Sequence, residues 1–151
     1  MNYEYKNTFR DISQHILSSA VLAAAVCFIS SDLSYGLIFL LGGIFIDLDH
    51  LFDYFSYKDK FSLRDFFGNV YLDSGRVYVL LHSWELNALI LAAALVFKSY
   101  GLFVLFLALS LHLAIDNAQR KNPMFYLLSY RIAKEFSVDT LLPERKDNPR
   151  Q

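Results

Sequence analysis

Long apolar runs constrain the fold of this chain more than any other feature of its sequence. A membrane-spanning helix needs about 20 mostly apolar residues, and four segments approach that length: 12–30, 35–55, 77–97 and 102–117. Hydrophobic residues make up 55% of the chain, above the roughly 45–50% of an average soluble domain. We therefore predict an all-α fold, an integral membrane four-helix bundle that forms one domain over residues 1–142.

The residues after the fourth run predict one more helix and a tail. Apolar side chains between residues 124 and 136 recur every three or four positions: Phe125, Leu128, Ile132 and Phe136. This spacing is typical of an amphipathic helix that lies on the membrane surface or against the bundle. Residues 143–151 are polar, and we expect them to form a disordered tail.

The distribution of charge predicts an orientation in the membrane. The turn between the first two runs contains no Lys or Arg, whereas segment 56–76 contains four and the residues after Asn117 contain seven. By the positive-inside rule, both termini are expected on the cytoplasmic side of the cell's inner membrane. The formal net charge is only −1, so bulk charge gives no reason to expect a nucleic-acid partner.

Each of the four apolar runs carries one of the four histidines, with a carboxylate one helical turn away. The pairs are Asp11 with His15, Asp47 with His50, His82 with Glu85, and His112 with Asp116. Side chains at these spacings share a helix face. An ionisable group at membrane depth costs roughly 2.5–3.5 kcal/mol and is usually paired or functional. We therefore expect the four pairs to meet at a common centre on the cytoplasmic side.

Facing helices of a bundle can build a metal site from such pairs. Imidazole nitrogen with carboxylate oxygen suits zinc, iron, manganese or nickel better than calcium. The predicted ligands exceed the four of a structural zinc, so we expect one or two divalent ions, with zinc as the first choice and manganese or iron as alternatives. These ligands are His15, Asp47, Asp49, His50, His82, His112 and Asp116.

Three carboxylates have more than one possible role in this prediction. In a regular helix Asp49 points about 100° away from His50, and it is retained both as a ligand and as a catalytic residue. Glu85 is predicted to be the general base that takes a proton from a metal-bound water, with a ligand role or a salt bridge to Arg76 or Arg120 as alternatives. Asp11 is predicted to support His15 from outside the ligand set or to act as a helix N-terminal charge.

The segment Phe45-Ile46-Asp47-Leu48-Asp49-His50 resembles the Pro-Asp-x-Asp-His element of the YdjM-like family of membrane-bound metal-dependent hydrolases, with Ile46 in place of the proline. In that family a His in the first helix, a His after the second loop and a late His-x-x-x-Asp accompany this element. His15, His82 and the segment from His112 to Asp116 match them in order. The last element is also similar to one in the helical zinc-dependent phospholipase C and nuclease group.

The resemblance implies a hydrolase that acts on a phosphoester or lipid-linked substrate beside the lipid bilayer. Two other functions remain open from the sequence: a proton- or ion-translocating protein, and a non-catalytic membrane protein with a structural metal. Conduction is disfavoured because the outer halves of the predicted spans hold almost no polar residues beyond Ser30, Ser31 and Asn87. The sequence specifies neither the oligomeric state nor one substrate.

Overall fold

The computed structural model describes residues 3–143, with side chains from residue 10 onward. Four long helices form most of it: α1 (Tyr3–Ser30), α2 (Leu33–Phe45), α5 (Trp84–Val96) and α6 (Tyr100–Gln119). The shorter helices are η1 (Ile46–Leu48), α3 (Asp49–Tyr57), α4 (Leu63–Phe67), η2 (Val70–Ser74), α7 (Leu128–Ala133) and α8 (Val138–Leu141). Within residues 3–143 the extended pairing is limited to one bridge between Arg76 and Ser137. The all-α prediction is confirmed.

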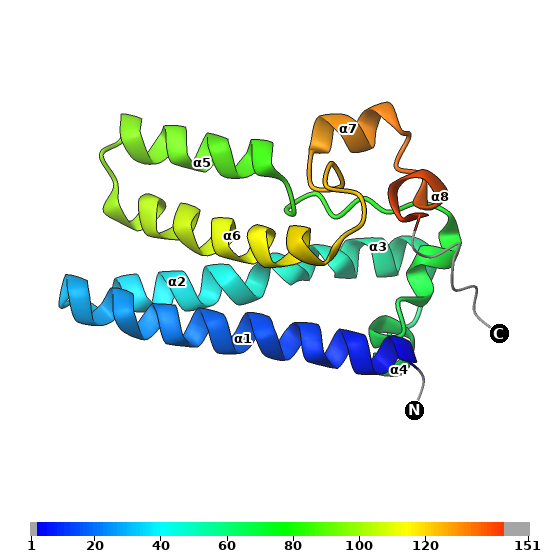
Figure 1. The fold of residues 1–151 in the computed structure, drawn as a ribbon, viewed down its shortest axis with the longest axis horizontal. Helices are drawn as coiled ribbons and strands as arrows, with labels where there is room; N and C mark the ends of the chain where they lie inside the picture. The colour runs from blue at the N-terminus through cyan, green and yellow to red at the C-terminus, as the bar shows by residue number, and fades with distance from the viewer. Residues whose placement is uncertain (1–2, 144–151) are drawn as a thin grey trace.

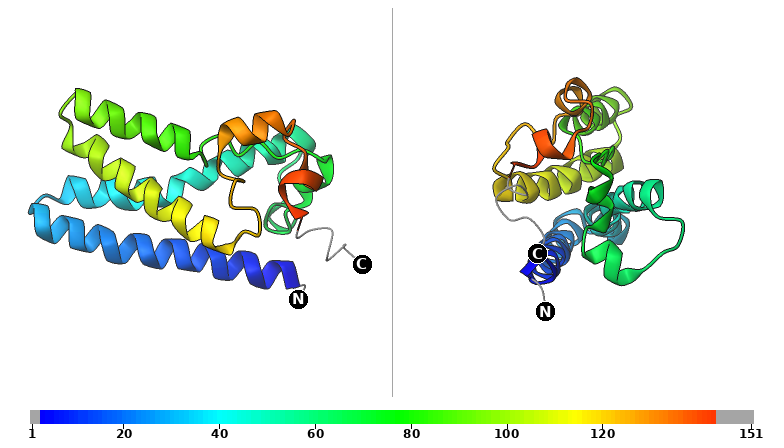
Figure 2. Two further views of the ribbon diagram at one scale, coloured as in Figure 1. Left: turned by 45° about the horizontal axis from the view of Figure 1, so that its top comes forward. Right: turned by 90° about the vertical axis from the view of Figure 1, so that its right-hand side faces the viewer.

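The long helices form two hairpins that lie side by side (Figures 1 and 2). Helices α1 and α2 make one hairpin and α5 and α6 the other, and both turns lie at the same end of the molecule. Helix α2 packs against both α1 and α6, whereas α5 packs chiefly against α6. The main contacts thus follow the order α1, α2, α6 and α5, with a smaller contact between α1 and α6.

Three stretches within the described residues are long and apolar enough to cross a membrane: Arg10–Ser30, Leu33–Tyr57 and Tyr100–Gln119. The predicted third span is wrong in its first part. Helix α5 starts at Trp84, where the side chain of Ser83 caps it by accepting from the backbone N–H of Leu86. Its 13 residues reach only about 20 Å.

Glycines let α2 lie close to both of its neighbours. A Cβ atom on Gly43 would collide with Oγ of Ser19 in α1, and one on Gly42 would come within 2.7 Å of Leu105 in α6. Close packing through small residues is the usual way in which helices associate in a bilayer, where the hydrophobic effect between them is lost. A small buried cluster of Ala23, Phe39, Val104 and Ala108 fills the same region.

The predicted helix over residues 124–136 is shorter in the structure. Residues 123–126 form turns, α7 begins at Leu128, and the chain reverses at Glu135 and Phe136, whose φ angles of 53° and 57° lie in the left-handed region. This segment covers the end of the long helices that lies opposite the two hairpin turns (Figure 1). The buried cluster that it joins comprises Ile46, Val77, Val79, Leu113, Phe125, Tyr126, Val138, Leu141 and Leu142. Beyond Pro143, the predicted tail lies outside the described residues.

We predict that Gly43→Ala lowers the thermal stability of the protein in detergent, because the new methyl group must push α1 away from α2. Overpacking of this kind costs about 1–3 kcal/mol. Gly101→Ala is the matched control, since its Cβ would meet the flexible end of Ile38 at 3.4 Å and should be tolerated. Equal melting temperatures for the two variants, measured by loss of the monodisperse peak after heating, would contradict this packing.

Candidate metal centre

The helices bring the predicted ligands to one depth. Counted at 1.5 Å per residue, His15, Asp47 and His112 lie about 18–22 Å from the hairpin end of their helices. His82 lies two residues before α5 begins, at a similar distance from that end. In a hydrocarbon core about 30 Å thick, this level is close to the interface opposite the hairpin turns.

Three ligand atoms form a nearly equilateral triangle at the centre of the cluster. Oδ1 of Asp47 lies 3.3 Å from Nε2 of His82 and 3.3 Å from Nε2 of His112, and the two nitrogens lie 3.3 Å apart. A tetrahedral ion with bonds of about 2.0–2.1 Å places its ligand atoms about 3.3–3.4 Å apart. Oδ2 of Asp116 lies 3.6 Å from each nitrogen. The donor set of two nitrogens and two oxygens fits one divalent ion.

The tautomers of the two buried imidazoles support this fit. Nδ1 of His112 lies 2.8 Å from the carbonyl oxygen of Gly43, and Nδ1 of His82 lies 2.9 Å from Oδ1 of Asp49. Both partners accept hydrogen bonds, so each Nδ1 carries the proton and each Nε2 presents a lone pair to the centre. Metal-ligating histidines typically donate their other ring N–H to such acceptors.

His50 has the same arrangement at the edge of the cluster. Its Nδ1 lies 3.0 Å from the hydroxyl of Tyr71, which donates its own proton to Oδ1 of Asn69 at 3.1 Å. The Tyr71 oxygen therefore accepts from His50, and burial raises the pKa of Tyr71 and keeps it neutral. Nε2 of His50 is 3.9 Å from Oδ1 of Asp47, so a third imidazole lone pair faces the same carboxylate.

The carboxylates favour positive charge at His82. Burial disfavours its imidazolium and by itself lowers the pKa of His82, but the contacts with Asp47 and Asp49 outweigh this effect and raise that pKa to about 9. A proton on Nε2 and a metal ion beside it compete for the same lone pair.

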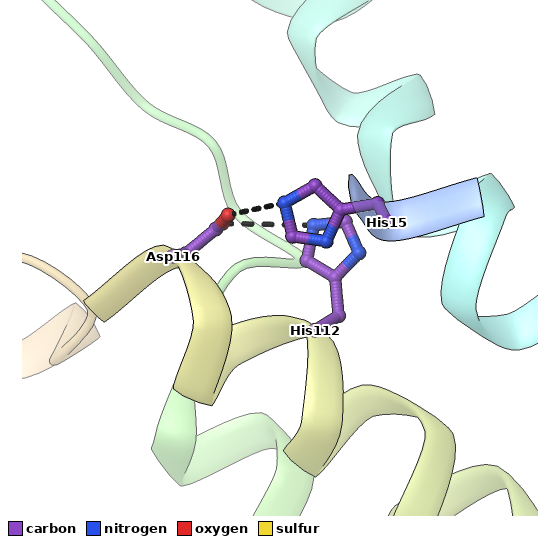
Figure 3. A group of neighbouring side chains, drawn as sticks. All are labelled: His15, His112 and Asp116. Carbon is purple, nitrogen blue, oxygen red and sulfur yellow. Dashed lines mark ion pairs between the residues drawn. The ribbon is translucent and has the colours of Figure 1, made fainter. Parts of the chain in front are cut away.

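Figure 3 shows a second group, made by His15, His112 and Asp116. The rings of His15 and His112 stack with centroids 3.8 Å apart. Nε2 of His15 lies 2.8 Å from Oδ1 of Asp116 and 3.5 Å from Asp11, yet among the described residues this buried nitrogen has no well-directed hydrogen bond. The group could hold an ion, and Asp116 faces both groups, with Oδ1 toward His15 and Oδ2 toward the triangle.

Asp49 lies behind His82 rather than beside Asp47. Its Oδ2 accepts from the backbone N–H groups of Leu81 at 2.7 Å and His82 at 3.2 Å, while Oδ1 faces the His82 ring. Asp49, His50 and His82 also lie close enough for an ion, but the hydrogen bonds already made by Asp49 favour a positioning role over the predicted roles of ligand and catalytic residue. Asp47 contacts Nε2 of His82 and Asp49 contacts Nδ1 of the same ring, so both carboxylates act on one imidazole.

Two residues whose roles here the sequence analysis did not predict hold the segment before His82 in place. Asp53 accepts from the backbone N–H groups of Tyr78 at 2.9 Å and Val79 at 3.1 Å. The fully buried Arg131 donates to the carbonyls of Tyr78, Val79 and His82 at 2.8, 2.6 and 2.9 Å. Val79 has a φ of 36°, a strained value for a β-branched residue. The spacing of Asp49 and Asp53, one helical turn, was a signal for the first of these residues, whereas Arg131 had none.

Glu85 is placed away from the cluster. Its carboxylate accepts from the backbone N–H groups of Leu128 at 2.9 Å and Ser129 at 3.0 Å, and from the hydroxyls of Ser129 and Ser83. It therefore caps the N-terminus of α7. The prediction that Glu85 shares a helix face with His82 was wrong, because His82 precedes the helix. The position of Glu85 does not support its predicted role as a base or a ligand.

A pocket of about 400 Å³ opens beside the centre. Asp47 and His50 line it from one side, and Asp11 and His15 line it from α1. The side chain of Asp47 is 39% exposed, whereas His82 and His112 are buried. A molecule in the pocket would therefore reach the centre through Asp47 and His50.

Comparison with models of protein families, with curated proteins and with solved structures finds no match for this chain.

We predict that Arg131→Met lowers the free energy of unfolding by about 3 kcal/mol or more, because it removes the side-chain donors from the carbonyls of Tyr78, Val79 and His82 and a nearby cation from Asp49 and Asp53. Arg131→Lys should recover part of this loss. Ile132→Ala, on the same helix but 57% exposed, is the control and should change little. Thermal unfolding in detergent measures the difference; an Arg131→Met protein as stable as the control would refute the positioning role.

Proposed function

We propose that this protein is a membrane-embedded metal-dependent hydrolase. Asp47, His82 and His112 hold the ion, Asp116 provides a fourth ligand, and zinc is the first choice of metal, with manganese or iron as alternatives. The observation that carries the proposal is the 3.3 Å triangle of one carboxylate oxygen and two imidazole nitrogens, in which both Nδ1 atoms already donate elsewhere.

The protein side of the chemistry follows from the positions of these side chains. A divalent ion bound there would lower the pKa of a water molecule to about 7 and polarise a phosphoryl or acyl oxygen. Asp49 and the carbonyl of Gly43 fix the tautomers of His82 and His112. Asp47 and His15 line the pocket. Each can receive a proton from the attacking water, Asp47 on a lone pair of its carboxylate and His15 together with its carboxylate partner Asp116. Glu85 has no part in this proposal.

The proposed setting is the inner membrane, with the centre on the cytoplasmic side and both termini in the cytoplasm. The long helices would form the membrane bundle, and α7 and α8 would cover its cytoplasmic end. A phosphoester or lipid-linked substrate agrees with the family resemblance and with a centre close to one interface. The resemblance to the YdjM-like hydrolases remains part of the proposal.

A proton or ion path is the strongest competitor, because the chain of His and Asp side chains could relay protons. Such a path must continue toward the hairpin end. Along the described helices, the buried polar side chains in that direction are Ser19 and Asn87, which donates to Ser110 at 2.8 Å, and the small core of Ala23, Phe39, Val104 and Ala108 is apolar. These residues disfavour conduction. A purely structural metal would give a metal-loaded protein without hydrolysis.

We predict one or two tightly bound transition-metal ions per chain in protein purified in detergent without chelator. His112→Ala and the isosteric Asp47→Asn should each lose at least one ion, because each removes a corner of the triangle. Glu85→Gln is the matched control and should retain both the metal and the hydrolytic activity. Elemental analysis by mass spectrometry gives the metal content, and release of phosphate or alcohol from a panel of esters gives the activity.

Folded wild-type protein without a transition metal would overturn the hydrolase proposal and favour a proton relay. Loss of metal in Glu85→Gln but not in Asp47→Asn would overturn the assignment of the ligands. Metal-loaded protein that hydrolyses no phosphoester or lipid ester would favour the structural-metal alternative.

A further inference from the structure

The pocket beside the centre combines apolar side chains with one cationic side chain, that of Arg120. Ile44 and Phe45 lie on the hairpin side of the triangle, Asp47 and His50 lie at its level, and Arg120 lies beyond it. Arg120 follows Asp116 by four residues, which corresponds to about 6 Å along a helix axis. The lining therefore offers apolar walls and one cationic group to an amphiphile, while Asp11, bonded to Gln119 at 2.8 Å, adds a carboxylate near Arg120.

The apolar side of the pocket borders the surface that would face lipid. Phe45 and Leu48 both line the pocket and are each 51% exposed, and they belong to an apolar stretch long enough to cross a membrane. Phe66 and Phe67 of α4 form another part of the wall. A hydrocarbon chain could thus pass from the bilayer into the pocket over aromatic and aliphatic side chains without crossing water.

The cationic side offers a partner for an anionic headgroup. The guanidinium of Arg120 stacks over the ring of Phe125 at 5.1 Å, and its Nε donates to the hydroxyl of Tyr126 at 3.4 Å. These contacts hold the side chain at the pocket wall. Arginine is well suited to phosphate because its donors match two oxygens at once.

We propose that the pocket binds a single-chain lipid phosphate, with the chain against Phe45, Leu48 and Phe67 and the phosphate between the metal centre and Arg120. This proposal rests on the proposed function, because the carboxylates of the centre repel a phosphate unless a cation offsets them. The volume of about 400 Å³ is at the lower end of the roughly 300–1,000 Å³ typical of small-molecule sites. That size suits a headgroup and part of one chain.

Tryptophan fluorescence tests this proposal without turnover. Trp84 is the only tryptophan of the chain, so Trp84→Phe gives a dark background into which Phe67→Trp places a reporter in the pocket wall. The probe is a dibromoalkyl phosphonate, which cannot be hydrolysed and whose bromines quench a tryptophan in contact with the chain. The dibromoalkyl alcohol of the same length is the neutral probe. Leu37→Trp, on the 46% exposed surface of α2, reports partition into the detergent micelle.

We expect saturable quenching of the Phe67→Trp reporter by the phosphonate, with at least about tenfold weaker binding of the alcohol. Arg120→Gln should weaken phosphonate binding about tenfold, as expected for loss of a charged hydrogen bond. The Leu37→Trp reporter should respond equally to both probes. Equal quenching of Phe67→Trp by both probes, or no quenching, would overturn the proposal. Displacement of the phosphonate probe by an equal concentration of methyl phosphonate, which lacks the long chain, would overturn it too.

Failure of this proposal and failure of the proposed function give different results. Metal-loaded protein that hydrolyses water-soluble esters, but whose Phe67→Trp reporter is not quenched, retains the hydrolase function and overturns the lipid phosphate. Saturable quenching in protein that contains no metal overturns the hydrolase and the placement of the phosphate beside a metal ion, and retains only a lipid site beside Arg120.

Discussion

The contact between Asp49 and His82 is the interaction on which the candidate centre depends. Asp49 lies where α2, after the tight turn of η1, continues as α3, and His82 lies on the segment that leads into the second hairpin. One carboxylate bonds the ring of His82 and the backbone N–H groups of Leu81 and His82. It therefore fixes the position, rotation and tautomer of an imidazole that no helix supports.

The same region concentrates unfavourable electrostatics. Asp47, Asp49 and Asp116 surround two buried imidazoles, and carboxylates so close together disfavour one another unless positive charge lies between them. The backbone also carries strain at Val79. Crowded like charges and strained backbone are typical of functional sites, where the surrounding structure maintains them. The rest of the fold supplies that support through α7, α8 and the apolar cluster around Leu113.

Much of the helical framework and the cluster could be predicted because both follow from local spacing. The pair of His112 and Asp116 lies on one helix, one turn apart, and both side chains face the centre. The predicted pairing of His82 with Glu85 failed because Ser83 is a good N-cap and starts the helix after His82. The roles of Glu85 and Arg131 depend on contacts 43 to 53 residues away in sequence, which no periodicity reveals.

The short α5 explains why Asp49, Asp53 and Arg131 are buried beside the segment that carries His82. A helix of about 20 Å leaves the backbone of residues 77–83, which leads to the ligand His82, without helical hydrogen bonds. Non-helical backbone at membrane depth is tolerated only where protein satisfies its polar groups. Asp49, Asp53 and Arg131 satisfy them from both sides, and in doing so they present His82 to the centre. The contacts that satisfy this backbone therefore also place the ligand His82.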